Sequence, residues 1–124
     1  MESDLPIPSK NALLYRVEVT VSPLLAREMP PVIEAFTRQW ARPEEVERSR
    51  NRDAGVLILS AENHLRPGEK PAELVRQITF AIWQALGRYV KVTADATYIG
   101  DPPQSSFEFG EEAYTRAFES RFES

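Results

Sequence analysis

The clearest pattern along the chain is the alternation of apolar and polar residues over 14–21. The apolar positions, which share one face of an extended chain, are Tyr15, Val17, Val19 and Val21. A period of two with β-branched residues is typical of a half-buried strand. The same period recurs over 90–99 and predicts another strand, and the short apolar run 56–60 predicts an inner one.

Two longer segments carry apolar residues at helical spacing. Pro71 opens the stronger one, which predicts a helix over 71–88. In the weaker one two consecutive prolines interrupt the apolar stripe, so we expect a short turn over 23–28 and a helix over about 31–41. A shorter amphipathic segment near the C-terminus predicts a helix over about 111–122.

The segment 43–50 fits two structures. Glu44 and Arg48 stand at helical spacing, whereas the alternating residues around them also fit an exposed edge strand. Because the turn-forming residues 51–55 and the apolar run 56–60 follow directly, we favour a hairpin.

The resulting order is strand, helix, strand, strand, helix, strand. It predicts an α+β fold with ferredoxin-like (βαββαβ) topology: a single sheet with two helices on one face, plus a short C-terminal helix. If 43–50 is helical, a three-stranded βαβαβ domain is expected instead. The length of 124 residues fits one domain. We expect 1–10 to be a flexible N-terminal arm and 11–124 to form a single α+β domain.

One face of such a sheet lies against the helices and the other is free. The polar positions of the first and last strands predict a charge-balanced free face with cross-strand ion pairs. These positions are Arg16, Glu18, Thr20, Lys91, Thr93, Asp95 and Thr97. The inner strand 56–60 carries apolar side chains on both of its faces, so we expect the tail aromatics or a second copy of the protein to cover the free face there.

The amino-acid composition excludes several kinds of metal-binding and catalytic site. The absence of cysteine excludes a disulfide scaffold, a thiolate zinc site and a cysteine nucleophile. With a single histidine, a His-His metal site would have to be built by oligomerisation. Neither a phosphate-binding glycine loop nor a G-x-S-x-G motif occurs. We therefore expect no cofactor, no metal site and no catalytic activity. Neither a signal peptide nor an apolar run of the roughly 20 residues that a membrane span needs is visible, which predicts a soluble cytoplasmic protein.

Misplaced aromatic residues favour a protein-interaction or self-associating module, with a homodimer as one form of it. On the 71–88 helix Phe80 falls in the polar face and Trp83 at the edge of that face. Large aromatics at such positions are typical of contact anchors, although the chain's own tail is another possible contact. The predicted interface residues are Phe80, Trp83, Phe107, Phe109, Phe118 and Phe122.

Arginines before the predicted turn support an alternative function, a nucleic-acid-binding accessory protein. The candidates are Arg42, Arg48, Arg50 and Arg52. On a strand the last three share one face, where they would contact phosphates. The intervening acidic residues, the net charge of −4 and a sheet face without stacking aromatics weigh against this alternative.

His64 supports a further alternative, a small ligand-binding protein or enzyme. It follows the inner strand on a predicted loop, where functional side chains often lie. In this hypothesis Glu62 orients His64 as a general base and Arg66 holds an anion. No nucleophile or second acid stands nearby in the sequence, which favours a histidine that makes only a local hydrogen bond.

Overall fold

The alternating valines predicted to form a strand lie at the centre of an antiparallel sheet. The computed structural model describes residues 13–51, 54–99 and 104–119, so the predicted arm 1–10 lies outside the described residues. The sheet order is β2-β3-β1-β4-β5. The strands are β1 (Leu14–Leu24), β2 (Glu45–Asn51), β3 (Ala54–His64), β4 (Lys91–Tyr98) and β5 (Gln104–Phe109).

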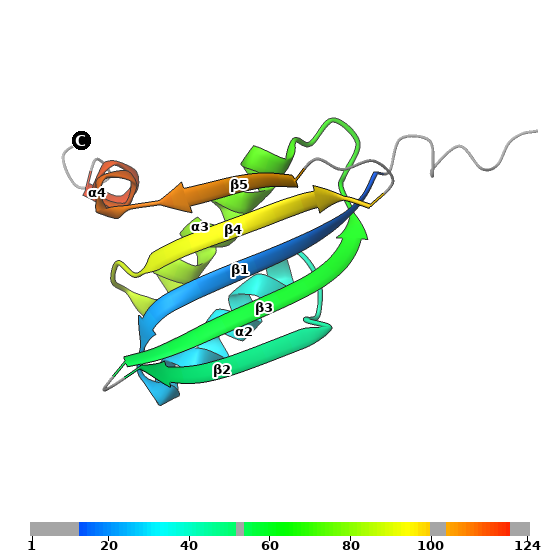
Figure 1. Cartoon of the computed structure of the whole chain (residues 1–124). Helices are drawn as coiled ribbons and strands as arrows, with labels where there is room; N and C mark the ends of the chain where they lie inside the picture. The colour runs from blue at the N-terminus through cyan, green and yellow to red at the C-terminus, as the bar shows by residue number, and fades with distance from the viewer. Residues whose placement is uncertain (1–12, 52–53, 100–103, 120–124) are drawn as a thin grey trace, which may run out of the picture.

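The helices lie on one side of this sheet. Figure 1 views the sheet from the other side, with α2 and α3 behind it, and shows α4 next to the end of β5. The helical elements are η1 (Ala26–Glu28), α2 (Met29–Gln39), α3 (Pro71–Leu86) and α4 (Glu111–Glu119). The arrangement is therefore a two-layer structure in which one sheet face is packed against helices.

The ferredoxin-like (βαββαβ) prediction is wrong, because the sheet has five strands in an order that is not a simple βαββαβ arrangement. The residues after the predicted last strand do not leave the sheet. They return as β5, in which Phe107 lies opposite Ala94 and Phe109 lies opposite Val92. Two large apolar side chains at a period of two thus extend the sheet by one strand.

The hairpin reading of 43–50 is confirmed, since β2 pairs antiparallel with β3 over its whole length. The predicted turn over 23–28 is only partly right. Leu24 still belongs to β1 and lies opposite Gly55, so a 3-10 turn remains only at Ala26–Glu28. The following helix begins at Met29, with both prolines in its first turn, where a missing backbone N–H removes no helical hydrogen bond.

The core lies between the sheet and the two helices. In β1 the odd-numbered residues Val17, Val19 and Val21 are fully buried. Their cross-strand neighbours are the equally buried positions of β3 and β4, namely Leu57, Leu59, Ala61, Val92, Ala94 and Ala96. Because side chains alternate along a strand, this register places the even-numbered residues Arg16, Glu18 and Thr20 of β1 on the opposite face.

Both tryptophans are buried with their indole N–H groups satisfied. Trp40 Nε1 donates to the carbonyl of Ala61 at 2.9 Å, and Asn63 Nδ2 donates to the Trp40 carbonyl at 2.8 Å. Trp83 Nε1 donates to the carbonyl of Val90 at 2.7 Å. Each bond ties the end of a helix to a neighbouring segment, which is why these large side chains are buried without an unpaired donor.

A two-point ion pair joins the start of α2 to the end of α3. Arg88 Nη2 lies 2.6 Å from Glu28 Oε1, and Arg88 Nε lies 2.9 Å from Glu28 Oε2. The same guanidinium donates to the carbonyl of Pro23. The hydrogen bonds from Arg88 lower the pKa of Glu28 from 4.5 to about 2, against the effect of burial.

Replacing Glu28 with Gln is expected to lower the free energy of unfolding at pH 7 by about 1–2 kcal/mol, because charge-assisted hydrogen bonds are lost at a mostly buried carboxylate. A carboxylate with a lowered native pKa stabilises the fold above pH 4.5 and loses this effect as the pH falls toward 2. Urea unfolding at pH 7, 4 and 3 should show the difference between wild type and variant shrinking. Glu34→Gln, which removes an exposed pair with Arg38, is the control. A difference that stays constant with pH would contradict this role.

Candidate functional site

The face of the sheet opposite the helices is covered by none of the described elements (Figure 1). We call it the open face. Its side chains are those that alternate along each strand with the side chains that face the helices. The acidic side chains on it are Glu18, Glu45, Glu47, Glu62, Asp95 and Glu108, and the basic ones are Arg16 and Lys91. The residues predicted for this face from β1 and β4 are balanced among themselves, but β2, β3 and β5 add four carboxylates and no basic side chain. The predicted charge balance is therefore wrong for the face as a whole.

A line of residues, one from each strand, crosses the middle of the open face. The register places Glu47, Ile58, Thr20, Thr93 and Glu108 side by side in that order. With strands about 4.8 Å apart, the line is about 19 Å long. Its centre is aliphatic and hydroxyl-bearing, and a carboxylate stands at each end.

Arg16 is already engaged by neighbouring side chains. Its Nη2 lies 3.0 Å from Glu45 Oε1, and its Nη1 lies 3.6 Å from Glu62 Oε2. Ser60, beneath this group, donates to Glu45 Oε1 at 3.1 Å and is almost fully buried. The positive charge of Arg16 is thus shared between two carboxylates and does not offset the remaining acidic groups.

Two carboxylates lie directly opposite each other on the central strands. Glu18 of β1 pairs in register with Asp95 of β4, where the sequence had predicted ion pairs. Like charges in this position are destabilising. Asp95 accepts a hydrogen bond from Ser106 Oγ at 2.7 Å. Both carboxylates line a hollow of about 210 Å³ together with Arg16 and Thr97. Among the described residues, no basic side chain pairs with Glu18 or Asp95.

The predicted interface aromatics lie on the helix side of the sheet, not on the open face. Trp83 is fully buried, with its ring 5.3 Å from that of Tyr114 and 6.2 Å from that of Phe118 in α4. Phe80 lies 6.1 Å from Phe118. The chain's own helix α4 therefore covers the part of α3 that the helical pattern left exposed.

The other tail aromatics follow the same side. Phe107 and Phe109 of β5 are opposite the buried Ala94 and Val92, so they point toward the helices. Phe122 lies outside the described residues. The expectation that the tail covers the inner strand is thus wrong for the described aromatics. In that strand Leu57 and Leu59 are in the core, whereas Val56 and Ile58 are on the open face and only partly buried.

The predicted arginine cluster is only partly assembled. Arg48 and Arg50 share one face of β2, as predicted, because they lie opposite Leu57 and Gly55. That face is on the helix side, where both line a cavity of about 300 Å³ with Leu24 and Met29 among its walls. The remaining two candidates are Arg42, which is exposed before β2, and Arg52, which lies outside the described residues.

Two of the three residues in the predicted group around His64 pair with other side chains. His64 is exposed at the end of β3, and its backbone N–H donates to Asn63 Oδ1 at 2.8 Å. Glu62 pairs with Arg16, and Arg66 Nη1 lies 3.6 Å from Glu69 Oε2. Since Glu62 and Arg66 are each engaged elsewhere, the arrangement gives the general-base hypothesis no support.

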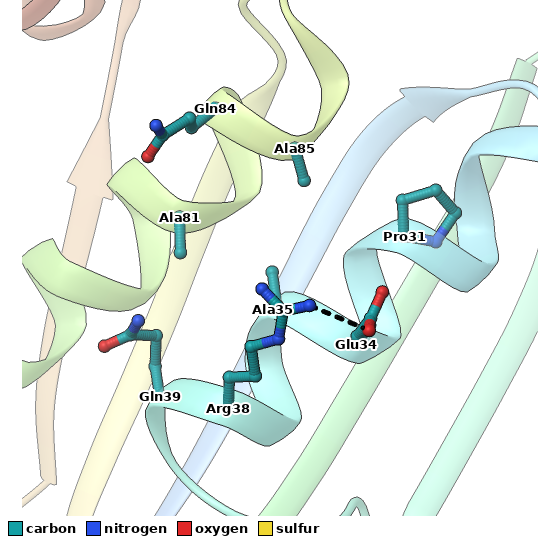
Figure 2. Close-up of a pocket in the computed structure, with 8 residues that line it drawn as sticks. All are labelled: Pro31, Glu34, Ala35, Arg38, Gln39, Ala81, Gln84 and Ala85. Carbon is teal, nitrogen blue, oxygen red and sulfur yellow. Dashed lines mark hydrogen bonds and ion pairs between the residues drawn. The ribbon is translucent and has the colours of Figure 1, made fainter.

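A groove of about 350 Å³ runs between α2 and α3 (Figure 2). Its walls carry Ala35, Ala81 and Ala85, small side chains that let the two helices approach closely. The polar groups at its rim include Arg38, which pairs with Glu34 at 3.0 Å. No titratable nucleophile or histidine lines the groove, so we interpret it as the seam of helix packing.

Comparisons with known proteins add no further assignment. No protein-family model, no curated protein and no solved structure matches the chain. Within the residues that the structure describes, no three histidine or acidic side chains are grouped as metal ligands. None of the described helices is long and apolar enough to cross a membrane.

Replacing Phe118 with Ala is expected to loosen α4 and expose Trp83 to water. The loss of a half-buried ring should lower the free energy of unfolding by roughly 1–3 kcal/mol. The tryptophan emission maximum should move to longer wavelength, and Phe118→Leu, which keeps an apolar cover, should move it less. If Phe118→Ala leaves emission and stability unchanged, α4 does not cover Trp83.

Proposed function

We propose that this chain is a non-catalytic protein-binding module whose open face binds a basic segment of a partner protein. The observation that carries this proposal is the combination of an uncovered sheet face with an excess of carboxylates over basic groups on it. A face of one charge sign selects partners of the opposite sign and speeds their association.

The centre of the open face supports contact with a protein chain. Ile58 and Val56 are partly buried aliphatic side chains, and Thr20 and Thr93 add methyl groups beside hydroxyls. Protein interfaces typically combine such a centre with a charged rim. Glu47 stands at one end of the central line, where it would meet a lysine or arginine side chain of a segment that crosses the strands. Glu108, at the other end, already pairs with Lys91, with Nζ 3.3 Å from Oε2.

The size of the face fits one segment better than a whole domain. It measures about 19 Å across the strands, and along them from about 20 Å at six-residue β5 to about 37 Å at eleven-residue β1 and β3. Even over the longest strands its flat area stays below the ~800 Å² per partner that is usual in stable protein complexes. We therefore expect a moderate affinity that depends on ionic strength.

Charge also disfavours two other partners at this face. Nucleic acid would bring phosphates against unpaired carboxylates such as Glu18 and Asp95. A second copy of the chain, packed face to face, would bring two acidic surfaces together.

The test uses a fluorescein-labelled peptide of ten lysines as the probe, with binding followed by fluorescence anisotropy at low salt. Wild type should bind it, and added salt should weaken the complex. The triple variant Glu18→Gln, Glu47→Gln, Asp95→Asn should lose about tenfold or more in affinity, because it removes the unpaired charge of the open face.

The matched control removes the same charge elsewhere. Glu34→Gln, Glu111→Gln, Glu112→Gln changes exposed residues of α2 and α4 and should alter the affinity by less than about twofold. Equal losses in both triple variants would mean attraction by net charge alone and would overturn the proposal. Tighter binding to a single-stranded oligonucleotide, or a dimer that Thr20→Arg dissociates, would overturn it as well.

A further inference from the structure

A second surface, independent of the open face, has the features of a small-molecule site. It is a pocket of about 450 Å³ between α3, β5 and α4, which we call the α3–α4 pocket. Its volume lies within the range usual for small-molecule sites. It is lined by Arg76, Phe80, Phe109, Ala113, Arg116 and Ala117.

The floor of the α3–α4 pocket is apolar and held in place by aromatic packing. The ring of Phe80 stacks on buried Trp83 at 5.7 Å and meets Phe118 edge-on at 6.1 Å. Phe109 is fixed by its place in β5 opposite Val92. Because packing within the protein holds these rings in place, the apolar floor is already formed before a ligand binds.

Small residues of α4 leave the space open. Ala113 and Ala117 are one helical turn apart and line the pocket on the same side of α4. Larger apolar side chains at these positions would fill the volume above the two phenylalanines. The pocket is thus a consequence of where alanines stand in α4.

The polar part of the lining carries only positive charge. Arg76 and Arg116 line the pocket and no acidic side chain does. Among the described residues no carboxylate forms an ion pair with Arg76, which stands one helical turn before Phe80. A guanidinium binds a carboxylate through two parallel hydrogen bonds, and an aromatic floor below it suits an attached hydrocarbon.

We infer that the α3–α4 pocket binds a small carboxylate with an apolar alkyl or aryl group. The carboxylate contacts Arg76 at the rim, and the hydrocarbon lies on Phe80 and Phe109. This site is separate from the proposed protein-binding face, because its lining belongs to the helix side of the sheet.

The test measures binding of octanoate and of uncharged 1-octanol to the full chain by titration calorimetry. Octanoate should bind about tenfold more tightly than 1-octanol, because only the anion bonds to Arg76. Arg76→Gln should bring the octanoate affinity down to that of 1-octanol and leave 1-octanol unchanged. Arg42→Gln, the same charge change beside β2 at the other edge of the sheet, should change neither.

A second variant tests the cavity itself. Ala117→Leu fills the space above the floor and should abolish binding of both compounds, with circular dichroism confirming that the fold is kept. Failure of wild type to bind octanoate, or binding that Arg76→Gln and Ala117→Leu do not affect, would overturn the inference.

Discussion

The position of β1 between β3 and β4 is the constraint on which the rest of the structure depends. Its buried valines determine which residues of both neighbouring strands face the core, because each strand aligns its own apolar positions with them. β2 pairs with β3 and β5 pairs with β4, so the register of these inner strands also determines which residues of β2 and β5 face the helices. A slip of one residue in β1 would move Arg16, Glu18 and Thr20 into the core, so the register is strongly determined.

The same alternation of side chains places the two candidate sites on opposite sides of the sheet. The helix side holds the aromatic residues, and α4 closes over Trp83 instead of crossing to the other face. The open face carries the polar side chains that alternate with the core-facing ones, and the carboxylates of β2, β3 and β5 make its net charge negative. The proposed protein-binding face and the proposed small-molecule pocket thus lie on opposite sides of one sheet, where each can be altered without the other.

Much of this arrangement could be predicted from periodicity, and the rest depended on tertiary contacts. The alternation around Val19 and the stripe opened by Pro71 define elements locally, so they were predictable. β5 was missed because Phe107 and Phe109 form only a short alternation after a turn-like segment, and its partner strand is what makes it a strand. Trp83 was misplaced because a helical wheel does not show that α4 will cover it.

The composition of the open face could also be predicted only in part. Residues Arg16, Thr93 and Thr97 were correctly assigned to it from their alternation with apolar neighbours. Its acidic character was not predictable, because the facing of Glu47 and the opposition of Glu18 to Asp95 both follow from register between strands. Sequence alternation gives the face of a residue within a strand, whereas its cross-strand neighbour depends on pairing.

The most direct measurement of the central claim is a titration of the isotope-labelled protein with a lysine-rich peptide, followed by NMR chemical shifts of the backbone amides. The largest changes are expected at Glu18, Thr20, Ile58 and Thr93, in the middle of the open face. Amides of α2 and α3 on the opposite side should stay nearly unchanged. Changes concentrated on those helices, or spread evenly over the acidic residues of the chain, would contradict the assignment of the open face as the binding surface.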